Sequence, residues 1–421
     1  MGSETMKSRS KLAAWAWVAL CSLAIFLVVP LARMIQYFVS SRWGRTAFGF
    51  AVLAGVAAAF LGIVYLLFFR LKIRSGPRYL WLAAVLGSYV FFTLKLWRAP
   101  EEAVHFLEYG VLGFLLFRAL SITVRDKTIY VTAFLAGSLI GTADEILQWL
   151  MPGRYWDFRD VGLNALAAGL IQVAIWKGVR PPVISETAGP RSLRRVSVLL
   201  AVQVVILGLC ASNTPSRTAR FVARFPSLSP LLREEPMYEF TIKHTDSEAG
   251  VFYSRLSIEE LETDDINRSD EWSRILGEWQ DRRYTDFLAH YSPLIHPFLY
   301  EMRIHIFRRD RKLEEARKAK TEKTRREALF IAFRENLILE RHFARTLEKS
   351  GYKWDPRLRT EAAAADDGTR PYRSPVSAGR FQVKETHLWA GIMLLLLALA
   401  SANLLSALRV RPPGPRRPMS A

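Results

Sequence analysis

The chain has 421 residues, of which 51% are hydrophobic, and it carries a formal net charge of +19 with only two cysteines. The hydrophobic residues occur in long runs with few charges, which excludes a single soluble domain and predicts membrane-spanning helices. Residues 213–387 contribute only +3 of the net charge, so most of the positive charge belongs to the membrane part. This positive charge suits contact with anionic membrane lipids. It gives no reason to expect a nucleic-acid partner.

Eight hydrophobic runs are long enough to cross a bilayer as helices. They lie near residues 12–33, 47–69, 79–97, 103–122, 129–150, 159–178, 195–212 and 388–408. The first run follows three basic residues, as in a signal peptide, but it exceeds a usual signal-peptide core and no small-residue cleavage site closes it. We therefore expect the first run to be retained as a helix.

The basic residues of the membrane part predict its orientation. Outside residues 213–387 the chain has 26 Lys and Arg, and 19 of them fall on the N-terminal side of the membrane if every run spans it. Because short cytoplasmic loops are rich in Lys and Arg, we expect both termini in the cytoplasm and residues 213–387 outside it. The sequence thus predicts a multi-pass protein of the bacterial cytoplasmic membrane. Cys21 and Cys210 lie in predicted spans, so we expect no disulfide in the external part.

Polar residues interrupt three of these runs near their predicted outer ends. On the fourth run His105, Glu108 and Tyr109 have helical spacing and share one face. The fifth run places Asp144 and Glu145 in its last two turns. A carboxylate inside a span costs at least a few kcal/mol, and such groups usually face a bundle interior or a wet cavity.

The fourth, fifth and sixth runs together bring nine polar side chains to one depth. The set consists of His105, Glu108, Tyr109, Asp144, Glu145, Gln148, Arg154, Asp160 and Asn164. Polar residues at helix ends often only cap helices or pair across them, but nine side chains from three helices exceed that need. We expect them to line a wet, outward-facing pocket, with Gly162 and Gly169 allowing close approach of the helices.

The order and spacing of these residues resemble the VanZ-like family of bacterial integral membrane proteins. The matching pattern is an H-x-x-E-Y helix, a D-E-x-x-Q segment, a P-G-R turn at residues 152–154 and a D-x-x-x-N helix. The resemblance covers roughly residues 60–180. Because the founding member is associated with low-level teicoplanin resistance, the resemblance implies a cell-envelope role, and it indicates a site more firmly than a reaction.

The nine residues fit several kinds of chemistry. Arg154 is suited to a bidentate contact with phosphate or carboxylate, and His105 beside Glu108 to proton transfer. Oxygen ligands for a divalent cation are also present, in Glu108, Asp144, Glu145 and Asp160. No nucleophile motif, phosphate-binding glycine loop or zinc-spaced Cys/His pattern occurs. We therefore predict no bound cofactor beyond that possible cation, and the sequence leaves open whether the protein is an enzyme.

The external part is expected to be mostly helical. After a linker at 213–236, the segments "MYEFTIK" and "GVFYSRL" alternate like the strands of a hairpin. Ser257 and Glu260 form a capping-box pattern at the start of a helix. Residues 297–354 are typical of helix, and we favour a hairpin bent near "KAKTEKT" over one long helix. The histidines of this part match no metal-ligand spacing.

The sequence as a whole predicts an all-α polytopic membrane protein with about eight transmembrane helices and a mostly helical extracytoplasmic domain. Its expected parts are a seven-helix membrane domain at 1–212, the external domain at 213–354, a flexible tether at 355–387, a last transmembrane helix at 388–408 and a basic cytoplasmic tail at 409–421.

Three functions are compatible with this organisation. The leading one is binding or modification of a polar cell-envelope molecule, such as a lipid-linked cell-wall intermediate or a glycopeptide-related ligand, at the nine polar residues. The second is a structural or interaction protein whose residues 237–354 bind another envelope protein. The third is an ion- or proton-coupled transporter, against which the lack of an evident inverted repeat argues.

Overall fold

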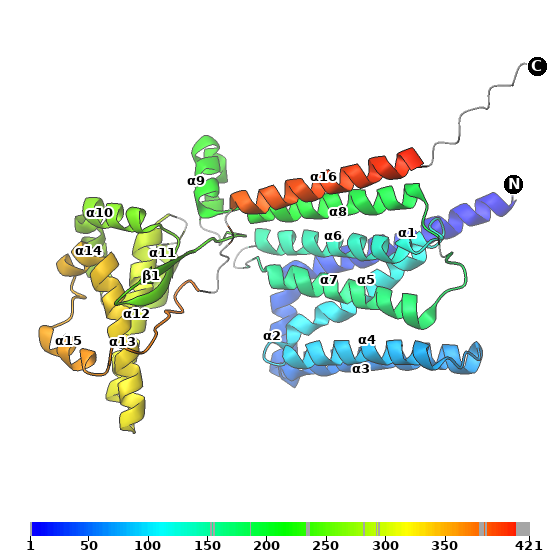
Figure 1. The fold of residues 1–421 in the computed structure, drawn as a ribbon. Helices are drawn as coiled ribbons and strands as arrows, with labels where there is room; N and C mark the ends of the chain where they lie inside the picture. The colour runs from blue at the N-terminus through cyan, green and yellow to red at the C-terminus, as the bar shows by residue number, and fades with distance from the viewer. Residues whose placement is uncertain are drawn as a thin grey trace, which may run out of the picture. The chain divides into compact units, whose positions relative to one another are not determined.

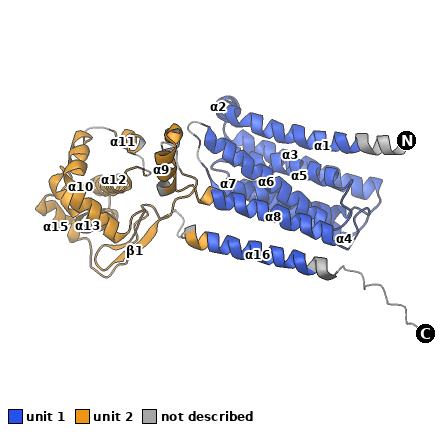
Figure 2. Ribbon diagram, turned by 90° about the horizontal axis from the view of Figure 1, so that it is seen from above, with its two compact units in different colours: residues 1–209, 389–421 blue, residues 210–388 orange. Residues whose placement is uncertain are grey.

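The structure is a computed structural model, and it divides into two compact units (Figure 2). Unit 1 comprises residues 1–209 and 389–421, and unit 2 comprises residues 210–388. The residues that the structure describes are 2–151, 154, 156–185, 187–232, 236–280, 283–291, 293, 295–378, 383 and 385–409. The predicted turn at Pro152 and Gly153 and the predicted tail beyond Arg409 lie outside these residues.

Unit 1 is a bundle of long helices that run alongside one another (Figure 1). Its α-helices are α1 (Gly2–Val28), α2 (Ala32–Trp43), α3 (Thr46–Tyr65), α4 (Gly76–Lys95), α5 (His105–Leu120), α6 (Thr128–Leu150), α7 (Phe158–Val173), α8 (Pro190–Ala211) and α16 (Glu385–Arg409). Short helical turns extend several of them: η1 (Val29–Leu31), η2 (Leu66–Arg70), η3 (Pro100–Val104) and η4 (Ala174–Val179).

Within the described residues, seven helical segments are long and apolar enough to cross a membrane. They are Ser10–Trp43, Thr46–Arg70, Pro100–Leu120, Thr128–Leu150, Phe158–Val179, Pro190–Ala211 and Thr386–Leu405. Their length and composition make the chain a multi-pass membrane protein, as the sequence predicted.

The sequence predicted eight membrane spans, one more than the seven apolar segments of the structure, and the difference is one helix. The run at 79–97 does form a helix, α4, but α4 is not among the seven apolar segments. Charged residues at its ends, Arg78 and Lys95, and polar residues between them lower its hydropathy. The helix nevertheless packs against α3, with Leu82 and Val85 buried (Figure 1). The bundle therefore holds seven apolar helices and one less apolar helix beside them.

The first helix breaks where the sequence alone predicted a plain span. Pro30 lies in η1, between α1 and α2, and proline removes a backbone donor and disfavours a continuous helix. Helix α2 buries none of its residues and exposes Tyr37, Phe38 and Trp43. Exposed aromatic residues beside Arg42 are typical of a helix at a membrane–water interface.

Unit 2 is mostly helical and includes one β-hairpin. Its elements are α9 (Pro215–Arg224), η5 (Pro226–Leu232), β1 (Ile242–Asp246), β2 (Gly250–Ser254), α10 (Ile258–Glu278), α11 (Tyr284–His290), α12 (Pro297–Arg317), α13 (Glu322–His342), α14 (Ala344–Lys349) and α15 (Pro356–Ala363). The predicted strand hairpin is confirmed, with His244 opposite Phe252 in the antiparallel register. The capping box of Ser257 and Glu260 is confirmed as well. Helices α12 and α13 form the predicted helical hairpin, which turns at 318–321.

The segment at 355–387, expected to be a flexible tether, is instead largely folded onto unit 2. Helix α15 forms within it, and Arg373 makes a parallel bridge with Val251 at the edge of the hairpin. Tyr372 and Ser374 are buried. The sequence suggested a tether because the residues that hold this segment lie far away along the chain.

Buried carboxylates join this segment to the helices of unit 2. Glu335 on α13 is fully buried, and its Oε2 lies 2.6 Å from His305 Nδ1 on α12. Its Oε1 accepts hydrogen bonds from Arg308 at 2.7 Å, Tyr372 at 2.6 Å and Ser374 at 2.9 Å. Burial favours the protonated acid, but the charges of His305 and Arg308 and these hydrogen bonds outweigh it and lower the pKa of Glu335.

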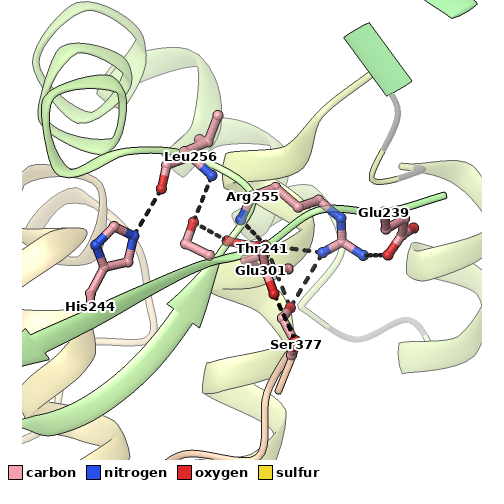
Figure 3. A network of polar contacts seen from close by, with 8 residues as sticks. Glu239, Thr241, His244, Arg255, Leu256, Glu301 and Ser377 are labelled. Atoms are coloured by element: carbon pink, nitrogen blue, oxygen red, sulfur yellow. Dashed lines mark hydrogen bonds and ion pairs between the residues drawn. The ribbon is translucent and has the colours of Figure 1, made fainter. Parts of the chain in front are cut away.

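A second network surrounds Arg255 (Figure 3). Its guanidinium is 7% exposed and contacts Glu301 at 2.9 Å and Glu239 at 2.6 Å. Glu301 also accepts hydrogen bonds from the Arg255 backbone at 2.9 Å and from Ser254 at 2.5 Å. The Arg255 guanidinium reaches Ser377, which belongs to the supposed tether, at 3.4 Å. Both networks therefore hold residues 372–377 against the rest of unit 2.

Loss of the Glu335 charge should destabilise unit 2. Glu335→Gln leaves Arg308 and His305 buried or half-buried without their counter-charge, and we expect a loss of about 3 kcal/mol. Hydrogen exchange of peptides from α12 and α13, measured on the full chain, reports this loss of stability as reduced protection. Glu348→Gln is the matched control, because the Glu348 side chain is 63% exposed and its ion pair contributes at most about 1 kcal/mol. Equal protection in the two variants would contradict the assigned role.

Acid should weaken unit 2 through His342. Burial, together with the nearby charges of His244 and Arg341, outweighs Asp246 and lowers the pKa of His342 to about 4. Because an unfolded histidine titrates near 6.5, this contribution to stability is fully present above about pH 6.5 and is lost as the pH falls toward 4. Hydrogen exchange across this range should show a steeper decline in the native chain than in His342→Gln. Parallel declines would refute the assignment.

Candidate polar pocket at one end of the helix bundle

The first turns of α5 place three of the nine polar residues. His105 begins the helix directly after η3, and its Nδ1 lies 3.4 Å from Glu108 Oε2. Tyr109 is fully buried one turn further on. Its hydroxyl donates a hydrogen bond of 3.0 Å to Asp144 Oδ2 on α6. The helical spacing of these residues thus aims one face of α5 at α6.

Both carboxylates of α6 are buried, since Asp144 and Glu145 are each 1% exposed. Gln148, one turn later, joins them through its amide nitrogen. The nitrogen donates to Asp144 Oδ2 at 3.1 Å and to Glu145 Oε1 at 3.2 Å. The Arg154 guanidinium in turn donates a hydrogen bond to the side-chain amide oxygen of Gln148, Oε1. One amide side chain therefore connects the acidic pair to the guanidinium of the following turn.

Helix α7 closes the cluster from the third side. Asp157 caps its start by accepting the Arg159 N–H at 2.7 Å. Asn164 is fully buried and donates to Glu145 Oε1 at 3.3 Å. Asp160, between them, lies beside Arg159 at 3.8 Å. The two α6 carboxylates consequently face different neighbours, Asp144 toward α5 and Glu145 toward α7.

Glycine allows α5, α6 and α7 to approach this closely. A Cβ at Gly141 would lie 2.8 Å from Asn164 Cβ and 3.1 Å from Tyr109 Cε1. The sequence singled out Gly162 and Gly169 instead. The structure shows open space at Gly162 and only ordinary contact distances at Gly169. The prediction also included the alanines between these two glycines, and α6 does approach closely at Ala168, where a Cβ at Gly137 would lie 3.0 Å from the Ala168 Cβ. Helical spacing alone did not reveal which of these small residues faces a neighbour.

A cavity of about 360 Å³ lies among these residues. Six of the nine predicted residues line it: His105, Glu108, Asp144, Gln148, Arg154 and Asp160. The other three, Tyr109, Glu145 and Asn164, form the layer behind, through the hydrogen bonds already described. The nine predicted side chains thus lie together as one cluster.

The sequence did not foresee the opposite wall of the cavity. It comes from α1, η1, α2, the start of α3 and η3, through Ile25, Val28, Val29, Ala32, Arg33, Ile35, Gln36, Phe48, Glu101, Glu102 and Val104. Most of these residues are apolar, so one wall is polar and the other largely apolar. Pro30, which breaks the first helix, was the available signal for this wall.

Carboxylates outnumber cationic side chains around the cavity. Five line it: Glu101, Glu102, Glu108, Asp144 and Asp160. Three of them meet arginines: Arg45 contacts Glu101, and Arg159 contacts Glu102 at 2.6 Å and Asp160 at 3.8 Å. Asp144 Oδ1 and Asp160 Oδ1 are buried and accept no hydrogen bond.

The possible divalent cation has no preformed ligand set in the described part of the chain. No group of three or more His, Cys, Asp or Glu side chains there is arranged to hold a metal ion. The carboxylates instead point to different neighbours, as the separate partners of Asp144 and Glu145 show. This arrangement favours a ligand that offers hydrogen-bond donors.

No family model matches the chain, and neither a curated protein nor a solved structure matches it. The resemblance to the VanZ-like family therefore stays a prediction. What the cavity does is inferred from its own geometry.

The close approach at Gly141 makes a direct test of the cluster's packing. Gly141→Ala forces Asn164 or Tyr109 to move, and we expect it to destabilise unit 1 by about 1–3 kcal/mol. Thermal unfolding of the purified chain in detergent measures this loss. Gly162→Ala is the matched control on α7, where nothing lies within 4 Å, and should be neutral or slightly stabilising. If Gly162→Ala lowered the unfolding temperature more than Gly141→Ala, the close helix approach at Gly141 would be contradicted.

Proposed function

We propose that the cavity binds the polar headgroup of a cell-envelope lipid, with a lipid-linked cell-wall intermediate as the leading candidate. The observation that carries the proposal is the two-sided lining, with carboxylates, His105 and Arg154 on one wall and apolar residues of α1 and α2 on the other. A headgroup with the first part of its hydrocarbon chain has the same two-sided character. Ligand sites typically combine an apolar lining with a few placed polar groups.

The location of the cavity supports the same function. It lies at the bundle end where α5 and α7 begin and α6 ends, which is the outer end if the distribution of Lys and Arg sets the orientation. At that level lipid headgroups meet water, and intramembrane carboxylates are tolerated where they face a wet cavity. We therefore propose that the cavity opens toward the extracytoplasmic leaflet.

Binding is proposed ahead of catalysis. The described residues that line the cavity include no Ser, Thr or Cys, and the His105–Glu108 pair is a proton-transfer group without an evident nucleophile beside it. The next cavity, between α3, α4, α5 and α7, is lined by apolar side chains apart from Tyr89. A transporter would need charged groups to continue along the bundle, whereas the buried polar residues of α6, α7 and α8 outside the cluster, such as Thr142, Gln172 and Gln203, are uncharged.

A glycopeptide-related role, which the VanZ-like resemblance implies, makes a measurable prediction. Expression in a sensitive Gram-positive host should raise the teicoplanin concentration needed for inhibition, with a smaller effect for vancomycin. Asp144→Ala and Arg154→Ala should each abolish the shift at matched membrane levels, because each removes a group that lines the cavity.

Asp157→Asn serves as the control for this experiment. It removes a carboxylate from the same end of the bundle, yet Asp157 does not line the cavity, and asparagine retains the capping oxygen. The control should keep the shift. A shift that survives in Asp144→Ala and Arg154→Ala would remove the cavity from the mechanism, and loss of the shift on deleting residues 237–354 alone would favour the interaction role of unit 2.

A further inference from the structure

We propose that the headgroup bound in the cavity carries a primary ammonium group, which donates hydrogen bonds to Asp144 and Asp160. This inference rests on the proposed lipid-binding function and names the chemistry that the site selects. Its basis is the geometry and the charge of the cavity lining.

The first argument is the charge around the cavity. Arginines neutralise Glu101 and Glu102 on one side, and His105 lies against Glu108. Asp144 has no arginine or lysine within ion-pair distance among the described residues, and Asp160 has only Arg159 at 3.8 Å. The charge of His105 also acts on both carboxylates, but among the described residues neither has an arginine or lysine nitrogen closer than 3.8 Å. A buried carboxylate is costly until a counter-charge reaches it.

The second argument is an open acceptor on a deeply buried side chain. Asp144 is 1% exposed and lines the cavity. Its Oδ2 accepts hydrogen bonds from Tyr109 and Gln148, whereas its Oδ1 accepts none. Since buried polar atoms almost always have a partner, the open oxygen leaves a place for a donor that none of the described residues supplies. Asp160 Oδ1 also lacks a hydrogen-bond donor among them, on a side chain that is 20% exposed.

A primary ammonium suits both carboxylates better than other cations do. It has three N–H donors and no acceptor, so one group is able to donate to more than one carboxylate oxygen. A quaternary ammonium has the same charge but no N–H, and would leave both oxygens open. A metal ion finds no prearranged group of ligands among the described residues.

The rest of the lining fits the neighbours of such an ammonium in a lipid. Arg33 and Arg154 also line the cavity and suit a phosphate group. Ile25, Val28 and Phe48 border the same space and suit the start of a hydrocarbon chain. The ligand is therefore an amphiphile that carries both an ammonium and a phosphate, which are close together in aminophospholipids and farther apart in lipid-linked intermediates with a free amine.

Matched lipids test the inference on the full chain. Native mass spectrometry of the purified protein in detergent measures the dissociation constants of phosphatidylethanolamine and phosphatidylcholine, which differ only in the N-methyl groups. We expect phosphatidylethanolamine to bind about tenfold more tightly, as for one or two hydrogen bonds to a charged group. A second arm compares a lysine-containing lipid-linked disaccharide pentapeptide with its Nε-acetylated form, and so distinguishes the two sources of the amine.

Variants connect the preference to the named oxygens. Asp144→Asn and Asp160→Asn should each reduce the preference for the free amine, whereas Asp157→Asn should preserve it. Unfolding temperatures of all three variants establish that they are folded. A preference that persists in a folded Asp144→Asn/Asp160→Asn double variant would overturn the assignment.

The outcomes also separate this inference from the proposed function. If amine and methylated lipids bind equally, and Arg154→Ala weakens both, the cavity is a headgroup site and the ammonium assignment is wrong. If no lipid binding depends on Asp144, Asp160 or Arg154, the proposed function itself fails, and the ammonium assignment falls with it.

Discussion

The need to satisfy two buried carboxylates governs the arrangement of unit 1. Asp144 and Glu145 are each 1% exposed on a helix that is apolar enough to span a membrane. A carboxylate in such surroundings needs hydrogen-bond partners from its neighbours. Tyr109 supplies one from α5, and Asn164 supplies another from α7. The three helices must therefore approach closely, which explains the glycine at the point of contact.

The local sequence pattern was enough to predict which polar residues form the cluster. The parts of the site that it did not predict depend on packing between residues that lie far apart in the sequence. Helical spacing put His105, Glu108 and Tyr109 on one face, and the structure brings that face to Asp144. Pro30 was a local signal for the break after α1, but no local pattern indicated that the residues on both sides of it line the cavity. The prediction of a flexible tether at 355–387 was wrong for a related reason. The composition of this segment does not reveal the residues, distant in sequence, that it contacts.

Unit 2 uses the same physical device without a membrane span. Glu301 and Glu335 are fully buried carboxylates, and each gathers partners from several elements. The hydrogen bond that Ser374 donates to Glu335 and the Arg255 contact with Ser377 hold residues 374–377 in place. Polar networks of this kind fix one arrangement because each unmade hydrogen bond would cost about 1–3 kcal/mol.

The difference between the two units lies in how completely the carboxylates are satisfied. Both oxygens of Glu335 and both oxygens of Glu301 accept hydrogen bonds within unit 2. Asp144 lines a cavity and accepts hydrogen bonds on one oxygen, while its other oxygen has no hydrogen-bond partner among the described residues. A carboxylate kept only for stability would be expected to be saturated like Glu335, because an open buried acceptor weakens the fold. The open oxygen is therefore the feature that favours a ligand-binding role for unit 1 over a purely structural one.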